Sequence, residues 1–259
     1  MAIGSLPSDP CGLREVTGVR IAGQCSRRPK ADKSMAKLRR EYREGLSGLE
    51  DRILSMGARV AEMLTEAMAA LDAHDLDRAD TVIRADDLLD EQYEDVHETI
   101  LTLFALQAPV ATELRLLSAF MHCNIHLERM GDLCVNIAKI VSLVSPESED
   151  PELMAQIQEM AQHARRVLDR SLEAVAKRDL DIVLSLPALD DPIDKLNRGL
   201  FKRMVQKAIV EEDKLDWAMR MVLVSRYLER MGDHGVDIGE QVYFIVTGDN
   251  IELASNSPE

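Results

Sequence analysis

The sequence predicts an all-α protein that consists of two tandem three-helix bundles. Only 3% of its 259 residues are aromatic, and Leu, Ala, Met, Glu, Arg and Asp dominate, a composition that favours helices. From Lys37 onward, apolar residues recur with the period of an α-helix, roughly 3.6 residues. The string Glu-Arg-Met-Gly-Asp occurs at residues 128–132 and again at 229–233, which indicates an internal repeat. Alternating Val/Thr/Tyr segments that would indicate strands are missing.

The N-terminal segment is expected to lie outside the folded part. Proline and glycine interrupt every possible element in residues 1–34, and no periodicity is present. Met35 stands where the helical pattern begins. We therefore interpret residues 1–34 as a disordered or spurious N-terminal extension.

The periodic part divides into six helices. A stripe of apolar residues supports the first helix: Met56, Val60, Met63, Leu64, Ala67 and Leu71. Pro109 suits the first turn of the third helix, and the Pro- and Ser-containing residues 145–151 form a linker. The expected helices are 38–73, 76–106, 109–144, 152–177, 181–210 and 214–246. The predicted bundles are residues 35–145 and 150–248, followed by a loose tail, 249–259.

Three matching blocks indicate a tandem duplication. Asp75-Leu76-Asp77 corresponds to residues 179–181, and Asp86-Asp87-x-x-Asp90 corresponds to residues 190–194, both at an offset of 104. The Glu-Arg-Met-Gly-Asp strings are offset by 101. We therefore expect the connection between the second and third helices to be three residues shorter in the second half.

Acidic pairs in each half predict a cation site. Carboxylates at i and i+4 lie on one helix face, and crowding them is unfavourable unless a cation neutralises them. Hard cations prefer such oxygen donors. The expected ligands are Asp86, Asp90, Glu128, Asp132 and Asn136 in the first half, and Asp190, Asp194, Glu229, Asp233 and Asp237 in the second.

Glycine and proline bear on these sites. Gly131 and Gly232 each cost about 1 kcal/mol relative to Ala inside a helix, which suggests close helix approach or room for a ligand. Pro192 suits the first helical turn with Asp191 as N-cap. A helix beginning there would leave Asp190 outside it and loosen the second site. Solvated acidic faces paired with Arg129 or Arg230 are the competing interpretation.

Histidines and cysteines give weaker signals. A ferritin-like carboxylate site requires Glu-x-x-His, but glycine follows Glu128 and Glu229 at i+3. His122 and His126 form an i, i+4 pair, yet His126 corresponds to Tyr227. The histidines, including His234, are therefore expected to be mostly structural. The four cysteines, Cys11, Cys25, Cys123 and Cys134, contain no CxxC pair and are expected to be free thiols.

Net charge restricts the class of partner. The chain carries −15, and residues 1–34 contain six basic against three acidic residues, so the remainder carries about −18. Nucleic acid is not expected as a partner, because phosphate binding requires a basic face. No run of eighteen apolar residues occurs, so we expect a cytoplasmic protein that is not inserted into a membrane.

The repeated Glu-Arg-Met-Gly-Asp strings resemble the PhoU family. Each is followed one turn later by Asn136-Ile137 or Asp237-Ile238, and residues 239–248 also resemble the last helix of that family. The resemblance covers residues 36–250. It implies two three-helix bundles and metal clusters (iron, zinc, magnesium or manganese) bound through acidic E(D)xxxD motifs. In this chain these motifs are Asp86 and Asp90 with Glu128 and Asp132, and Asp190 and Asp194 with Glu229 and Asp233.

The resemblance also implies a function. PhoU proteins connect the phosphate ABC transporter ATPase with a membrane sensor histidine kinase and restrain the phosphate-starvation response. We therefore expect a non-enzymatic negative regulator, peripheral to membrane complexes and a possible homodimer. The alternatives are a di-iron carboxylate oxidase or ferroxidase and a purely structural helical scaffold.

Overall fold

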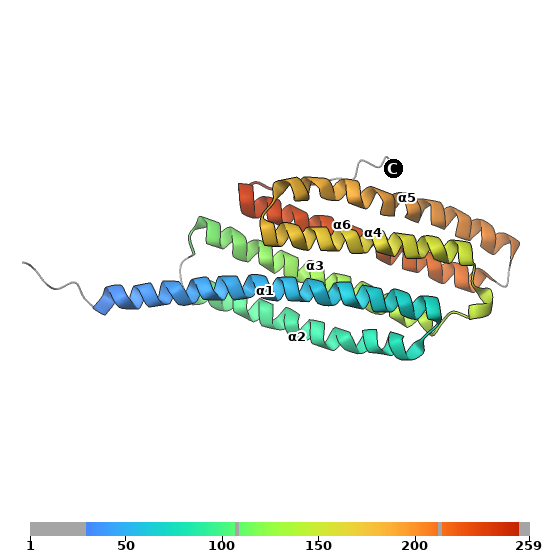
Figure 1. Cartoon of the computed structure of the whole chain (residues 1–259), viewed down its shortest axis with the longest axis horizontal. Coiled ribbons are helices and arrows are strands. Elements are labelled where there is room, and N and C mark those ends of the chain that lie inside the picture. Colours follow the sequence, from blue (N-terminus) through green and yellow to red (C-terminus); the bar gives the residue numbers. More distant parts are fainter. Residues whose placement is uncertain (1–29, 107–108, 212–213, 254–259) are drawn as a thin grey trace, which may run out of the picture. The chain divides into compact units, whose positions relative to one another are not determined.

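The computed structural model describes residues 30–106, 109–211 and 214–253. These ranges contain six long helices and one short 3-10 turn, and no strand (Figure 1): α1 (Lys30–Ala73), α2 (Leu76–Leu106), α3 (Ala111–Val141), η1 (Pro146–Ser148), α4 (Pro151–Lys177), α5 (Leu180–Val210) and α6 (Leu215–Thr247). Residues 42–259 form one unit, which the following paragraphs describe, and the first 41 residues form another. The all-α prediction is confirmed.

The start of α1 differs from the prediction. The helix begins at Lys30, eight residues before the expected Leu38. Pro29 is the last helix-breaking residue of the N-terminal segment, and the following Lys, Ala and Met residues favour helix. Residues 1–29 of the predicted extension lie outside the described residues.

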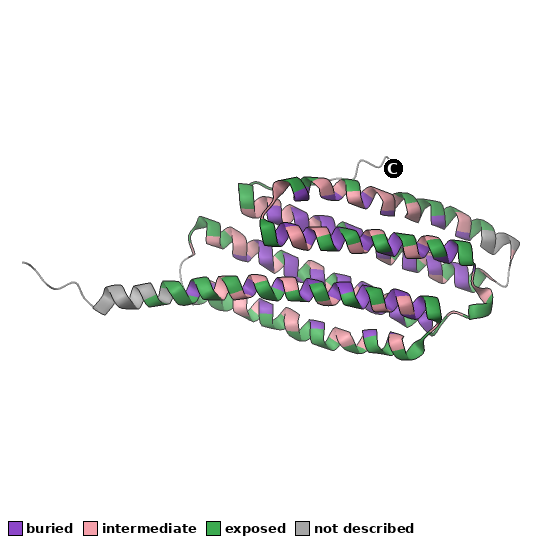
Figure 2. Cartoon of the chain, in the orientation of Figure 1, coloured by how far each residue is buried: buried purple, intermediate pink, exposed green. Residues whose placement is uncertain are grey.

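Within residues 42–259, the helices form two three-helix bundles that share one core. Helices α2 and α3 pack together, as do α4, α5 and α6. Helix α3 contacts α6, and Gln158 Nε2 on α4 donates to the carbonyl of Met68 on α1 at 3.2 Å. Buried residues line the facing sides of these helices (Figure 2). The predicted stripe of α1 is confirmed, because all six of its members are at most 2% exposed.

The two halves end and begin their helices in the same way. His74 after α1 and Arg178 after α4 both adopt left-handed backbone, at φ 50° and 55°. The Asp75 carboxylate then accepts from the backbone N–H of Arg78, and that of Asp179 accepts from Asp181 N. The repeated Asp-Leu-Asp block therefore caps the second helix of each half.

The three-residue difference between the halves lies elsewhere than predicted. Four residues separate α2 from α3, and four separate α5 from α6. Glu128 is the eighteenth residue of α3, whereas Glu229 is the fifteenth of α6. The prediction of a shorter connection was wrong, because the deletion shortens the first turns of α6.

Helix α5 continues through both of its prolines. Pro187 and Pro192 lie inside it, and Asp190 between them is helical and 4% exposed. The expected helix 181–210 is therefore continuous, and the alternative in which a helix begins at Pro192 does not hold. Each proline removes one backbone hydrogen bond, but α5 buries Leu186 and Ile193 completely on either side of this segment. Packing therefore outweighs the local signal, and Asp190 is held firmly.

Helices that could traverse a bilayer are not found among the described residues.

Candidate functional site

The first acidic cluster consists of Asp86 and Asp90 on α2 and Glu128 and Asp132 on α3. Burial raises the pKa of Asp86 above its usual value, and the charges of Asp90 and Asp132 raise it further. Burial likewise raises the pKa of Glu128, with added repulsion from Asp132, Asp90 and Asp86. The structure therefore brings these four predicted residues into one electrostatically coupled group.

The second acidic cluster consists of Asp190 and Asp194 on α5 and Glu229 and Asp233 on α6. Burial, followed by repulsion from Asp194, Asp233 and Glu229, raises the pKa of Asp190 to about 7. Burial and the charge of Asp233 raise the pKa of Glu229 to about 7. Asp190 Oδ1 and Glu229 Oε2 are buried and accept no hydrogen bond from the described part of the chain. Two enclosed oxygens thus retain unused acceptor capacity.

Glycines explain how the helices come this close. A Cβ on Gly232 would lie 2.0 Å from Asp190 Oδ1, and one on Gly131 would lie 2.1 Å from Leu89 Cδ2. Any larger residue would displace the side chain opposite. The glycine of each repeated string therefore lets α2 approach α3 and α5 approach α6.

Arginines neutralise part of each cluster. Arg129 lies 3.5 Å from Glu128 and 3.4 Å from Asp132, as the competing interpretation expected. In the second cluster Arg226 pairs with Glu229. Arg198 approaches Asp194 only to 4.0 Å. Neither cluster is fully compensated, because raised carboxyl pKa values persist in both.

The remaining predicted ligands extend each cluster by one turn. Asn136 follows Asp132 on α3, and Asp237 follows Asp233 on α6; both are half-buried. The charge of Asp237 contributes to the raised pKa of Asp233. The donor set is oxygen only, which suits hard cations. No three described carboxylates of either cluster have oxygens mutually within 4.8 Å, so binding one ion through three of them requires side-chain rotation.

The structure also places together two histidines that sequence reasoning treated as structural. His126 on α3 and His234 on α6 meet each other and Asp237. Comparing the halves with each other hid this group, because His126 corresponds to Tyr227 and His234 to Leu133. The group forms at the interface between the two halves, where α3 contacts α6, so a comparison of corresponding positions does not detect it.

Comparison with known proteins identifies the family. A family model described as the PhoU domain matches the chain twice, over residues 53–141 and 157–242. The chain belongs to the PhoU family. Each PhoU match spans one three-helix bundle, including one acidic cluster, so the duplication read from the sequence corresponds to two family domains.

Curated PhoU relatives cover most of the chain. A protein of Synechocystis sp. named phosphate-specific transport system accessory protein PhoU homolog is 32% identical over 211 residues, 80% of this chain and 92% of that protein. A relative of the same name from Clostridium acetobutylicum is 27% identical over 216 residues, 83% of this chain and 98% of that protein.

Solved PhoU structures share the fold. The crystal structure of PhoU from Pseudomonas aeruginosa matches with a TM-score of 0.77 at 25% identity, covering 80% of this chain and all of that one. The phosphate transport system regulatory protein PhoU from Streptococcus pneumoniae matches with a TM-score of 0.77 at 25% identity, covering 82% of this chain and all of that one.

Proposed function

We propose that this protein is a metal-binding negative regulator of the phosphate-starvation response. In this role it is an adaptor between the phosphate ABC transporter and a sensor histidine kinase. Membership of the PhoU family and the names of its relatives support the link to phosphate transport. The observation that carries the metal-binding part is the second acidic cluster, where two buried carboxylate oxygens have no hydrogen-bond partner among the described residues.

The residues of the second acidic cluster have defined roles in this proposal. Asp190 and Glu229 present to the cation the oxygens that have no hydrogen-bond partner among the described residues. Asp190 packs closely against α6 because Gly232 has no side chain. Asp194 and Asp233 complete an oxygen donor set. A bound cation such as Mg²⁺, Mn²⁺, Fe²⁺ or Zn²⁺ supplies the positive charge that offsets their repulsion.

Metal content tests the site. The full chain carrying Asp190→Asn and Glu229→Gln, loaded with Mn²⁺ and dialysed, is expected to retain less metal in elemental analysis than the unmodified protein. Asp80→Asn with Glu159→Gln is the matched control, because it removes the same charge from exposed positions of α2 and α4. Equal metal content in both double variants would contradict the site.

Cell experiments test the regulatory part. A strain lacking the gene should express a phosphate-starvation reporter in phosphate-rich medium, and the unmodified chain should restore repression. Pull-downs from phosphate-replete cells should recover the transporter ATPase and the kinase in larger amounts than pull-downs from starved cells. Recovery of neither partner in either condition would refute the adaptor role. Oxygen consumption on adding Fe²⁺ would favour the ferroxidase alternative instead.

A further inference from the structure

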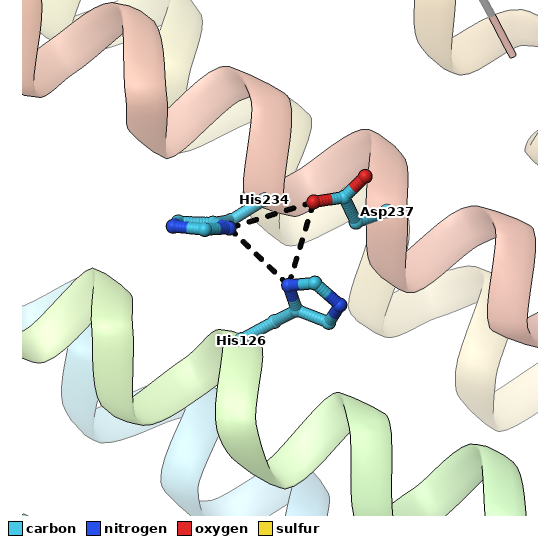
Figure 3. Close-up of side chains that lie close together, drawn as sticks. All are labelled: His126, His234 and Asp237. Carbon is cyan, nitrogen blue, oxygen red and sulfur yellow. Dashed lines mark hydrogen bonds and ion pairs between the residues drawn. The ribbon is translucent and has the colours of Figure 1, made fainter.

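We infer that His126, His234 and Asp237 form a zinc-class metal site that joins the two repeats. His126 projects from α3, the last helix of the first repeat, and His234 and Asp237 project from α6, the last helix of the second (Figure 3). Among the described residues, these are the one group of three possible ligands whose donor atoms lie mutually within 4.8 Å. The site shares Asp237 with the extension of the second acidic cluster, but it differs from both clusters in its donor chemistry and does not require metal there.

Three distances define the geometry. His126 Nδ1 lies 3.2 Å from His234 Nδ1 and 3.4 Å from Asp237 Oδ2, and His234 Nδ1 lies 3.5 Å from the same Oδ2. Four ligands placed tetrahedrally at about 2.1 Å from zinc are about 3.4 Å apart, whereas octahedral ligands at that distance are about 3.0 Å apart. The triangle therefore matches three corners of a tetrahedron with little movement of any side chain.

Hydrogen bonding alone does not satisfy these three atoms. With both imidazoles neutral, a proton on one Nδ1 can point to the other ring or to the carboxylate. In every neutral state, at least one of the three close contacts therefore joins two acceptors or two donors. His234 Nε2 on the far side of the ring is buried and has no partner within the described residues, so the ring makes its polar contacts through Nδ1. A cation uses all three lone pairs at once.

Exposure leaves room for a fourth ligand. The two imidazole side chains are only 19% and 17% exposed, whereas that of Asp237 is 41% exposed. Asp237 also lines a pocket of about 260 Å³ together with the acidic residues Asp190, Asp233 and Glu240. This acidic pocket attracts cations to the neighbourhood of Asp237, and a water molecule can complete the coordination.

Ligand type distinguishes this site from the acidic clusters. Imidazole nitrogen favours zinc and later transition metals, whereas carboxylates alone suit Mg²⁺ and Mn²⁺. A metal held by His126 and by the two α6 ligands ties α3 to α6. It thereby fixes the position of one acidic cluster relative to the other.

Cobalt substitution tests the proposal. The full chain is titrated with Co²⁺ in the presence of excess Mg²⁺, which occupies the acidic clusters, and the visible absorption of four-coordinate Co²⁺ is recorded. We expect the band in the unmodified chain and its displacement by one equivalent of Zn²⁺. His126→Gln and His234→Gln should each weaken binding by at least the roughly 10–100-fold that loss of a residue supporting a metal ligand costs, because each removes one of three protein ligands. His163→Gln, on α4 and outside the triangle, is the matched control and should bind as the unmodified chain does.

A second measurement covers variants that fold poorly. X-ray absorption of the zinc-loaded unmodified chain should show about two imidazole nitrogens and a short coordination shell. The double variant Asp190→Asn and Glu229→Gln should keep the cobalt band, so failure of the acidic-cluster proposal and failure of this one are distinguishable. A spectrum of six-coordinate Co²⁺ only, or equal Zn²⁺ affinity in His126→Gln, His234→Gln and His163→Gln, would overturn the inference and leave a hydrogen-bonded histidine pair.

Discussion

Replacing Gly232 by alanine has two opposing effects on the free energy of unfolding, a gain in helix propensity and a loss from overpacking. In an open helical position Gly→Ala stabilises by about 1 kcal/mol. At Gly232 the new Cβ would lie 2.0 Å from Asp190 Oδ1, 3.2 Å from Asp190 Cγ and 3.0 Å from Ile193 Cδ1. Asp190 is 4% exposed and Ile193 is fully buried, so neither can move into solvent without repacking. Overpacking of this kind costs about 1–3 kcal/mol.

Gly199 provides the matched control. It lies in α5, and a Cβ there meets nothing within 4 Å. The propensity gain is common to Gly232→Ala and Gly199→Ala, so their difference in unfolding free energy isolates the overpacking cost, about 1–3 kcal/mol. Gly131→Ala should be intermediate, because its Cβ would crowd one atom, Leu89 Cδ2, whereas at Gly232 three atoms lie within 3.2 Å.

Urea denaturation followed by circular dichroism measures these differences. Gly199→Ala should be more stable than the unmodified protein, and Gly232→Ala should be less stable than Gly199→Ala by the stated amount. Equal stabilisation by the two substitutions would refute the reasoning. It would mean that the Asp190 carboxylate is not packed against α6, and the second acidic cluster would lose its structural basis.

Three further outcomes are expected. In metal-free protein, burial raises the pKa of Asp190 from 3.8 to about 7, so the folded state binds this proton more tightly than the unfolded state. The resulting stabilisation is fully present below pH about 4 and is lost as the pH rises through about 7. The melting temperature of Asp190→Asn should therefore rise relative to the unmodified protein across that range. Cys123 and Cys134 are buried, and burial raises the pKa of Cys123 to about 12; both should resist iodoacetamide until the protein unfolds, as mass spectrometry can show. Asp150 accepts from the N–H groups of Glu152 and Leu153 at 3.1 Å, so Asp150→Ala should cost about 1 kcal/mol in urea denaturation.

Helix positions were predictable because they depend on local signals. Predicted and observed bounds of α2 agree. The bounds of α4, α5 and α6 differ from the predicted ones by at most one residue at either end. Apolar periodicity and capping residues act within a few turns, so the sequence alone carries them. The larger differences are the start of α1, eight residues earlier than expected, and the ends of α3, which spans 111–141 rather than 109–144. Helix α5 remains helical through Pro192, as expected, because its flanking residues are buried.

The acidic clusters were predictable for a different reason. Spacing of i, i+4 places two carboxylates on one face, and the repeat doubles the signal. The pairing of the helices that carry these carboxylates could be inferred only from the antiparallel arrangement. The burial of the carboxylates could not be inferred from the sequence. The pairing of His126 with His234 was not predictable, because it depends on how α3 of one repeat packs on α6 of the other.

The repeats differ in chemistry along one stripe of the last helix. At corresponding positions Leu133 becomes His234, Asn136 becomes Asp237 and Lys139 becomes Glu240, an i, i+3, i+6 series on one side of α6. In the first repeat, the charge of Lys139 lowers the pKa of Asp86. In the second, Glu240 instead joins the acidic pocket beside Asp190 and Asp233.

These three differences act in the same direction. They remove one positive charge, add two negative charges and introduce an imidazole, so the second repeat attracts cations more strongly than the first. They also supply both α6 ligands of the histidine site, for which the first repeat offers only Leu133 and Asn136. The two repeats, although their helices correspond, therefore differ in how strongly they attract cations. Any metal-dependent behaviour should depend more on the second repeat than on the first.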